Sequence, residues 1–338
     1  MSGRARGVVA ITGASAGVGR ALSRLMAAEG FDVGLIARGR DGLEGARAEV
    51  LAAGRKACLC VADVAVASQV EAAAERIEGE LGPIDIWVNN AMVSIFSPVA
   101  DITPEEVRRV TEVTYLGAVY GTLAALKRMR SRDRGVIVQV GSALAYRSIP
   151  LQSAYCAAKH AMKGFTDSLR SELIHERSGV RVTMVQLPGL NTPQFGWVRS
   201  KLRRHPRPVP PIYEPEVAAQ AIYWASQNPR RELNVGWQTV KAIVGEHFIP
   251  GMLDRLLAGP CGYDSQLGPE QQQPRPDNLY APLPGDAGAH GVFHRIARRR
   301  TWQFLLTAHR RAIGAAGMMA LALAVAQRKP RRRKTSST

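Results

Sequence analysis

The chain of 338 residues carries a formal net charge of +17, and 46% of its residues are hydrophobic. That apolar share suffices for a full core and excludes an intrinsically disordered chain. The last 44 residues, 295–338, hold twelve Lys and Arg and no Asp or Glu, so the basicity is mostly a property of this tail. The four cysteines lack the spacing of metal ligands, which favours reduced thiols in a reducing compartment and predicts no metal site.

The first element is a short buried strand over residues 7–11, which runs into a glycine-rich turn and then a helix over residues 20–29. A strand, a glycine-rich turn and a helix form the context of a dinucleotide-binding loop. Glycines let the backbone approach a pyrophosphate, and the helix N-terminus offers N–H groups to it. The cofactor-binding residues predicted in this turn are Gly13, Ser15, Gly17, Val18 and Gly19.

A second strand over residues 32–37 is followed by Arg38. Sites for NAD usually place an acid here for the ribose 2′-hydroxyl, whereas an Arg suits a 2′-phosphate through a forked, charge-assisted contact. The sequence therefore favours NADP(H) over NAD(H). Arg40 either assists or is ordinary surface charge.

Four further apolar runs predict strands over residues 56–61, 84–88, 135–140 and 180–185, with helical stretches between them. Nearly continuous apolar strands are typical of a parallel sheet covered on both faces. The expected fold is therefore α/β, a Rossmann-type doubly wound parallel sheet with a C-terminal extension. Every motif lies at the carboxyl end of a strand, where open α/β sheets bind ligands.

Tyr155 and Lys159 stand four residues apart and hence on one face of a helix, and Ser142 lies thirteen residues earlier. An ammonium beside a phenol stabilises the phenolate and lowers the pKa of the Tyr, which then can exchange a proton with a carbonyl or an alcohol. These three residues are the predicted catalytic group.

These motifs, in this order, resemble the short-chain dehydrogenase/reductase family over residues 6–250. The resemblance implies that Tyr155 is the general acid/base, that Lys159 holds the nicotinamide ribose and tunes Tyr155, and that Ser142 orients the substrate oxygen. It implies further cofactor contacts at Asp63 (to the adenine), Asn90, Leu190 and Thr192. It also implies a homo-oligomer in which helices near residues 104–130 and 153–175 pair across a two-fold axis.

The chain departs from the family pattern at two positions. Met92 stands where the family has a glycine, so that a side chain lies beside the cofactor or the substrate. Thr114 aligns with an Asn that in the family helps to hold a water of the proton relay; we count Thr114 among the catalytic residues and expect an altered relay or reduced activity.

By the same resemblance, residues 190–213 form a lid over the substrate, with Phe195 and Trp197 facing it. Ser94, Ile95, Phe96, Leu144 and Tyr146 are expected on the opposite wall, and Met92 beside them. The aromatic lid residues either contact an apolar substrate or anchor the lid to the core. An apolar alcohol or ketone is the expected substrate.

The composition predicts a catalytic domain over residues 1–250, a Gly/Pro-rich, loosely ordered linker over 251–300 and a basic, apolar tail over 301–338. The apolar run 312–326 is shorter than the roughly 20 residues of a membrane span. A shallow membrane anchor, a helix docked on the body and a spanning helix are the three readings left open. No recognition motif supports nucleic-acid binding.

Two functions follow as hypotheses. The first is an NADP(H)-dependent oxidoreductase that interconverts an alcohol and a carbonyl on a small, apolar substrate. The alternative, favoured only by Thr114, is a low-turnover NADP(H)-binding sensor or scaffold that acts through the basic tail. No secretory signal is recognisable, so the expected location is cytoplasmic, with residues 301–334 as the segment able to hold the chain to a membrane face.

Overall fold

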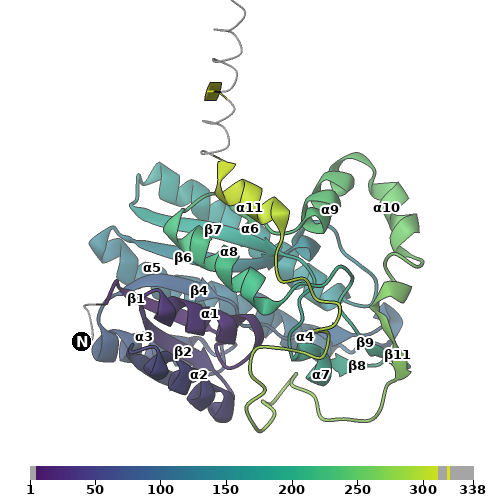
Figure 1. The fold of residues 1–338 in the computed structure, drawn as a ribbon, viewed down its shortest axis with the longest axis horizontal. Helices are drawn as coiled ribbons and strands as arrows, with labels where there is room; N and C mark the ends of the chain where they lie inside the picture. The colour runs from purple at the N-terminus through teal and green to yellow at the C-terminus, as the bar shows by residue number, and fades with distance from the viewer. Residues whose placement is uncertain (1–4, 311–317, 320–338) are drawn as a thin grey trace, which may run out of the picture.

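The computed structural model describes residues 5–310 and 318–319, and its centre is a seven-stranded parallel sheet (Figure 1). The spatial order of the strands is β10-β7-β6-β4-β1-β2-β3. From β1 the chain adds β2 and β3 on one side, and it then crosses to the other side of β1 to add β4 and the later strands, with β4 parallel to β1. The strands are β1 (Val8–Thr12), β2 (Asp32–Ala37), β3 (Ala57–Val61), β4 (Ile84–Asn89), β6 (Gly135–Ser142), β7 (Val180–Leu187) and β10 (Glu232–Asn234).

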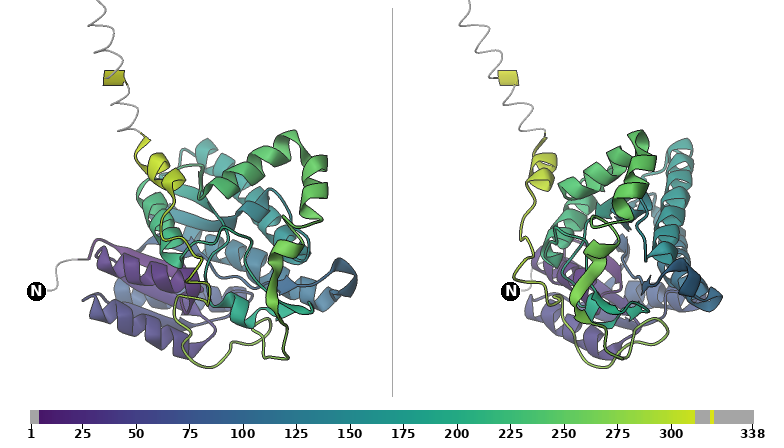
Figure 2. Two further views of the ribbon diagram at one scale, coloured as in Figure 1. Left: turned by 45° about the vertical axis from the view of Figure 1, so that its right-hand side comes forward. Right: turned by 90° about the vertical axis from the view of Figure 1, so that its right-hand side faces the viewer.

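Helices cover both faces of the sheet, and Figure 2 shows the two helical layers on either side of it. One face carries α1 (Gly17–Ala28), α2 (Arg40–Ala52) and α8 (Pro215–Gln227). The other carries α3 (Ala67–Leu81), α4 (Pro104–Thr111), α5 (Gly117–Met129) and α6 (Ser153–His175). The predicted doubly wound α/β fold is therefore confirmed.

The strands follow from their composition. All five residues of β1, Val-Val-Ala-Ile-Thr, are buried, because β-branched side chains pack well on a sheet that is covered on both faces. The six predicted strands correspond to β1, β2, β3, β4, β6 and β7. The seventh, β10, escaped prediction because it is only three residues long and begins with Glu232.

A π-helical turn, Glu112–Leu116, joins α4 to α5 and contains Thr114. Helix α4 begins at a capping box, in which the Thr103 hydroxyl accepts from the N–H of Glu106 and the Glu106 carboxylate accepts from the N–H of Thr103. π-Helical turns such as Glu112–Leu116 are rare inside α-helices and occur often at functional sites.

The remaining elements lie outside the central sheet and its two helical layers. They are the short helix α7 (Gln194–Trp197), the paired strands β5 (Ile95–Phe96) and β8 (Arg199–Ser200), the antiparallel pair β9 (Arg204–Pro206) and β11 (Leu267–Gln271), and the helices α9 (Trp237–Phe248), α10 (Pro250–Leu257) and α11 (Trp302–Ala308). Single 3₁₀ turns lie at Val99–Asp101, Arg130–Arg132, Ala143–Ala145 and Asp264–Gln266.

The segment after β11 differs from the loosely ordered linker expected over residues 251–300. Although almost free of helix and strand, it runs along the edge of the molecule and returns to α11 (Figure 1). Leu279 is fully buried in the core, and the Arg298 N–H donates to the carbonyl of Ile212. Backbone hydrogen bonds and a few buried side chains thus order a segment whose composition gives no periodic signal.

Within residues 5–310 and 318–319, no helix has the length and apolarity needed to cross a membrane. The predicted apolar run 312–326 and the basic run 328–334 lie outside the described residues, apart from Met318 and Met319.

Candidate active site

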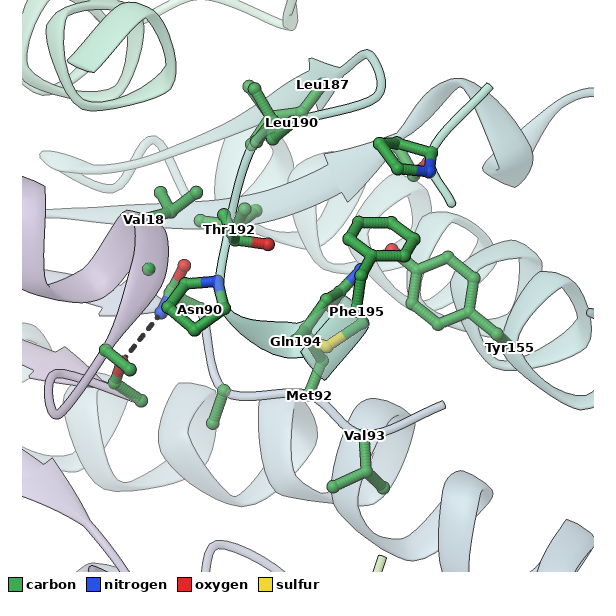
Figure 3. Close-up of a pocket in the computed structure, with 18 of the residues that line it drawn as sticks. Val18, Asn90, Met92, Val93, Tyr155, Leu187, Leu190, Thr192, Gln194 and Phe195 are labelled. Atoms are coloured by element: carbon green, nitrogen blue, oxygen red, sulfur yellow. Dashed lines mark hydrogen bonds between the residues drawn. The ribbon is translucent and has the colours of Figure 1, made fainter. Parts of the chain in front are cut away.

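A cavity of about 650 Å³ opens at the carboxyl ends of the parallel strands. This volume falls within the roughly 300–1,000 Å³ of small-molecule and cofactor sites. The cavity extends from Arg38 and Asp63 at one end, past the glycine-rich loop, to Tyr155 and Lys159 at the other. In Figure 3, Asn90 and Thr192 lie on one side of the view and Tyr155 on the other.

The glycine-rich loop has the close packing that its glycines predict. Gly13 has a φ of +69°, and a Cβ added at Gly19 would lie 2.1 Å from the carbonyl oxygen of Gly13. Helix α1 has Ala16 as its N-cap residue, makes no side-chain cap hydrogen bond and has no acidic residue in its first turn. This helix N-terminus therefore keeps its positive dipole end toward the cavity, as a phosphate group requires.

Asn90 and Thr12 join the glycine-rich loop to strand β4. The Thr12 hydroxyl accepts from the N–H groups of Asn90 (2.9 Å) and Ala91 (3.0 Å), and the Asn90 amide donates to the carbonyl of Thr12 (2.9 Å). These contacts hold two strand ends in one arrangement. Thr12 directly precedes Gly13 of the glycine-rich turn, and the sequence did not predict this structural role.

Ser142, Tyr155 and Lys159 meet at the opposite end of the cavity. Lys159 Nζ lies 5.6 Å from the centre of the Tyr155 ring and donates to the carbonyl of Val140 at 2.8 Å. Ser142 Oγ accepts from the N–H of Leu144 at 3.2 Å, and its hydroxyl hydrogen-bonds the Tyr155 phenol. The end of β6 and the first turns of α6 thus bring the three predicted residues together.

Burial dominates the electrostatics of this group. It raises the pKa of Tyr155, opposed by the hydrogen bond with Ser142. It also lowers the pKa of Lys159 to about 7, since Lys159 is only 3% exposed. The structure therefore differs from the expectation that Lys159 lowers the pKa of Tyr155, because an ammonium that is itself desolvated is only partly charged near pH 7.

Thr114 lies behind the cavity wall and is fully buried. Its hydroxyl donates to the carbonyl of Val93 (2.8 Å), and its oxygen accepts from the N–H of Val93 (3.1 Å). Val93 itself lines the cavity next to Met92. In this arrangement Thr114 fixes the loop after β4.

At the other end of the cavity, the polar side chains of Arg38 and Asp63 have partners within the protein. The Arg38 guanidinium donates to the carbonyls of residues 278–280. Asp63 Oδ2 lies 2.5 Å from the guanidinium of Arg109 in an ion pair. Neither partner was predicted, because Arg109 lies on α4 and residues 278–280 are distant in sequence.

The predicted substrate residues divide into two groups. Met92, Leu144, Phe195 and Trp197 line the cavity. Ser94, Ile95 and Phe96 are buried outside it, because the short pair β5–β8 turns this segment into an apolar cluster where the Phe96 ring lies 6.1 Å from that of Phe195. Tyr146 also faces elsewhere and donates to Glu232.

The predicted lid, residues 190–213, is closed at its base and packed on the body. The Tyr213 N–H donates to the carbonyl of Gly189, and the Asn191 N–H donates to the carbonyl of Tyr213. Lys201 pairs with Glu106 on α4 at 2.7 Å. Leu190, Thr192 and the prolines of residues 208–211 line the cavity, so the lid forms one of its walls.

One part of the cavity wall was not predicted from the sequence. Residues 278 and 282–287 of the C-terminal extension line it near Arg38. Most of their contacts use backbone groups, which no residue pattern reveals.

The chain is similar to proteins of known family. The family model described as "short chain dehydrogenase" matches residues 7–202. The chain is 34% identical over 273 residues to the "Uncharacterized oxidoreductase YxnA" of Bacillus subtilis, and the match covers 80% of this chain and 76% of that protein.

Two solved structures are also similar. A short chain dehydrogenase of Mycobacterium paratuberculosis bound to NAD is 27% identical, with a TM-score of 0.59, and the match covers 68% of this chain and 95% of that one. An alcohol dehydrogenase of Thermococcus sibiricus complexed with 5-hydroxy-NADP is 24% identical, with a TM-score of 0.59 and coverage of 68% and 94%, and shows a common fold. The two cofactors differ, so these similarities favour neither.

Proposed function

The chain belongs to the short-chain dehydrogenase/reductase family, and from this premise we propose that it interconverts an alcohol and a carbonyl with NADP(H) as cofactor. The meeting of Ser142, Tyr155 and Lys159 at one end of a cavity whose middle is a glycine-rich loop carries this proposal. Gly13, Gly19 and the start of α1, which has no side-chain cap, fit a dinucleotide.

When bound, a nicotinamide cofactor would give the hydride in the reducing direction and accept it in the oxidising direction, and the residues of the chain handle the proton. In the reducing direction Tyr155 donates its phenol proton to the carbonyl oxygen of the substrate, and in the oxidising direction it takes the proton from the alcohol. Ser142 hydrogen-bonds the same oxygen and orients it. Lys159, held by the carbonyl of Val140, places positive charge next to the phenolate that forms.

The preference for NADP(H) rests on Arg38, which lines the cavity where strand β2 ends. A fluorescence titration with NADPH and NADH tests it in the wild type, Arg38→Ala and Arg40→Ala. We expect Arg38→Ala to weaken NADPH binding about tenfold, the size of one charge-assisted contact, and to leave NADH binding nearly unchanged.

Arg40 is the matched control, because it follows Arg38 by two residues, is exposed and pairs only weakly with Glu44 at 3.8 Å. Equal affinity of the wild type for both cofactors would contradict the preference. Failure to bind either cofactor would contradict the proposed function as a whole.

The substrate we propose is a small apolar ketone or alcohol. Apolar side chains of Met92, Leu144, Ile149 and Phe195 line the cavity around Tyr155. Such a surface favours an apolar group beside the reacting oxygen, since burying it releases water.

Assembly and location complete the proposal. Exposed Leu123 on α5 and Ile174 on α6 support a homo-oligomer formed through these helices. Exposed Phe248 and Trp302, with the basic tail beyond α11, support peripheral contact with an anionic membrane on the cytoplasmic side. Sedimentation of the full chain with anionic but not with zwitterionic vesicles is the expected result, and no sedimentation would contradict it.

A further inference from the structure

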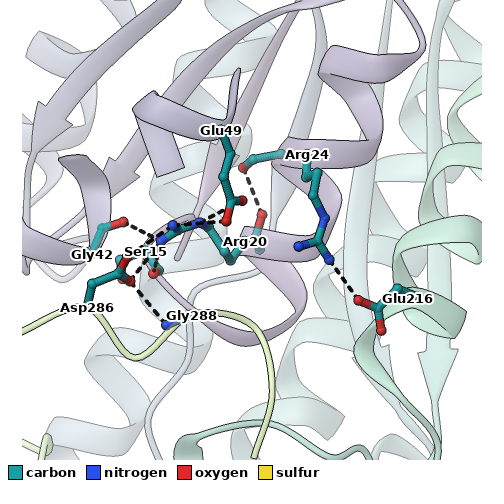
Figure 4. Close-up of polar contacts among 10 residues, drawn as sticks. Ser15, Arg20, Arg24, Gly42, Glu49, Glu216, Asp286 and Gly288 are labelled. Atoms are coloured by element: carbon teal, nitrogen blue, oxygen red, sulfur yellow. Dashed lines mark hydrogen bonds and ion pairs between the residues drawn. The ribbon is translucent and has the colours of Figure 1, made fainter. Parts of the chain in front are cut away.

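Residues 277–288 cross the Arg38 end of the cavity as a segment without helix or strand, which we call the strap. It is held at both ends by a carboxylate. Asp277 pairs with Arg199 at 2.8 Å and also accepts from the N–H of Leu279. Asp286 makes a two-pronged contact with Arg20, at 2.9 and 3.1 Å, next to the glycine-rich loop (Figure 4).

The Asp286 anchor is attached to a rigid part of the site. The side chain of Arg20 is almost completely buried and also pairs with Glu49 and donates to the carbonyl of Gly42. The carbonyl of Gly288 accepts from the N–H of Gly17 at 3.1 Å. Figure 4 shows these groups converging where α1, α2 and the strap meet. The strap is therefore a built part of the structure.

Between its anchors the strap contacts Arg38 through its backbone. Arg38 donates one N–H to the carbonyl of Asn278 (2.6 Å), one to that of Tyr280 (3.0 Å) and one to that of Leu279 (3.4 Å). A guanidinium has five N–H groups, so at most two of those of Arg38 remain for another acceptor. Pro282 also lies against Gly39, the residue that follows Arg38.

A 2′-phosphate is best bound by two parallel N–H groups of a guanidinium, and the strap carbonyls already accept from both terminal nitrogens of Arg38. We propose that the strap is a specificity-determining element of the cofactor site: its carbonyls compete with the 2′-phosphate for Arg38 and thereby restrain the preference for NADP(H) over NAD(H). The inference rests on the proposed function, because it requires a dinucleotide in the cavity. A cofactor without the 2′-phosphate leaves the contacts of Arg38 with the strap intact.

The test removes the side-chain contacts that hold the two ends of the strap and leaves Arg38 unchanged. The double variant Asp277→Ala/Asp286→Ala removes both anchors, and Glu216→Gln is the matched control. Glu216 pairs with His290 at 2.9 Å, so it holds the same extension beyond the strap. Dissociation constants for NADPH and NADH are measured by nicotinamide fluorescence on the full chain, with circular dichroism as the check of folding.

We expect the ratio of NADPH affinity to NADH affinity to rise about fivefold to tenfold in the double variant and to stay unchanged in Glu216→Gln. Arg38→Ala added to the double variant removes the rise, because the competition needs both partners. The ratio of the two affinities separates this competition from a general change in the cavity. Loss of the strap as a cavity wall changes the binding of NADPH and NADH alike and therefore leaves the ratio unchanged.

Hydrogen exchange on the wild type gives a second readout that needs no variant. The amides of Leu279 and Gly285 are hydrogen-bonded to Asp277 and Asp41. We expect them to exchange faster with saturating NADPH than with saturating NADH. An unchanged affinity ratio together with equal exchange overturns the inference alone, whereas failure of both cofactors to bind overturns the proposed function and the inference with it.

Discussion

The two ends of the cavity are built in different ways. The Tyr155 end comes from β6 and α6, whose residues are close in sequence and held by the central sheet. The Arg38 end combines the end of β2 with a strap some 240 residues further along the chain. The proposed chemistry therefore depends on spacing within one part of the fold, whereas the proposed control of cofactor choice depends on how a distant segment lies.

The largest effect expected is at the Tyr155 end. Tyr155→Phe removes the proposed proton donor, and we expect turnover to fall by about 10²–10⁴-fold, the usual contribution of a general acid/base. We expect NADPH binding to remain, because the phenyl ring of Phe fills the space of the Tyr155 ring. Steady-state assays and the fluorescence titration measure the two effects separately.

Tyr223→Phe serves as the control for removing a phenol hydroxyl, since Tyr223 donates to Glu29 at 2.7 Å and does not line the cavity. Equal loss of turnover and of NADPH binding in Tyr155→Phe would show that Tyr155 acts in binding and not as the proton donor.

The second effect concerns stability. Lys159 has a pKa of about 7 in the folded chain, while an unfolded Lys stays protonated to about pH 10.4. Between these values the unfolded chain binds more protons, so the contribution of Lys159 to stability becomes more favourable as the pH rises. We expect Lys159→Met to be more stable than the wild type by about 1–3 kcal/mol at pH 6, with a difference that shrinks toward pH 10.

Urea unfolding at several pH values measures this difference. Lys163→Met controls for the loss of a lysine on the same helix, where Lys163 pairs with Asp167 at 2.8 Å. Wild-type and Lys159→Met stabilities that run parallel with pH would contradict the account of a desolvated ammonium.

The smallest effect is expected at Thr114. Thr114→Val keeps the shape but leaves the buried N–H and carbonyl of Val93 without their partner, which lowers stability by about 1–2 kcal/mol. Thr114→Ser restores the hydroxyl and most of the stability. Thr111→Val is the control, because the hydroxyl of Thr111 is exposed and donates to the carbonyl of Val107. This substitution should change stability by less than about 0.5 kcal/mol.

Much of the fold could be predicted because the signals are local. The apolar run of β1 followed by Gly13 and Gly19 predicts strand, turn and helix, and the four-residue spacing of Tyr155 and Lys159 places both on one helix face. The family and the doubly wound sheet are confirmed. The roles of the site residues and the preference for NADP(H) stay predictions.

The remainder depends on contacts that no pattern contains. Phe96 leaves the cavity because β5 pairs with β8, about a hundred residues later. The strap contacts Arg38 through backbone carbonyls, which every residue has, so these contacts leave no signal in the sequence. The Gly/Pro-rich composition of the segment therefore predicted a loosely ordered linker. Burial also reversed the expected shift in the pKa of Tyr155, since desolvation depends on the whole surrounding structure.

The central claim is that this cavity performs turnover. The most direct measurement mixes the full wild-type chain with NADPH and a panel of apolar ketones, and follows the nicotinamide absorbance and the products together. The account predicts that NADPH is consumed in step with the formation of alcohol for at least one ketone, and that Tyr155→Phe does not do so. NADPH that binds tightly yet stays unoxidised with every ketone, and NADP that oxidises none of the corresponding alcohols, would contradict it and favour a low-turnover sensor or scaffold.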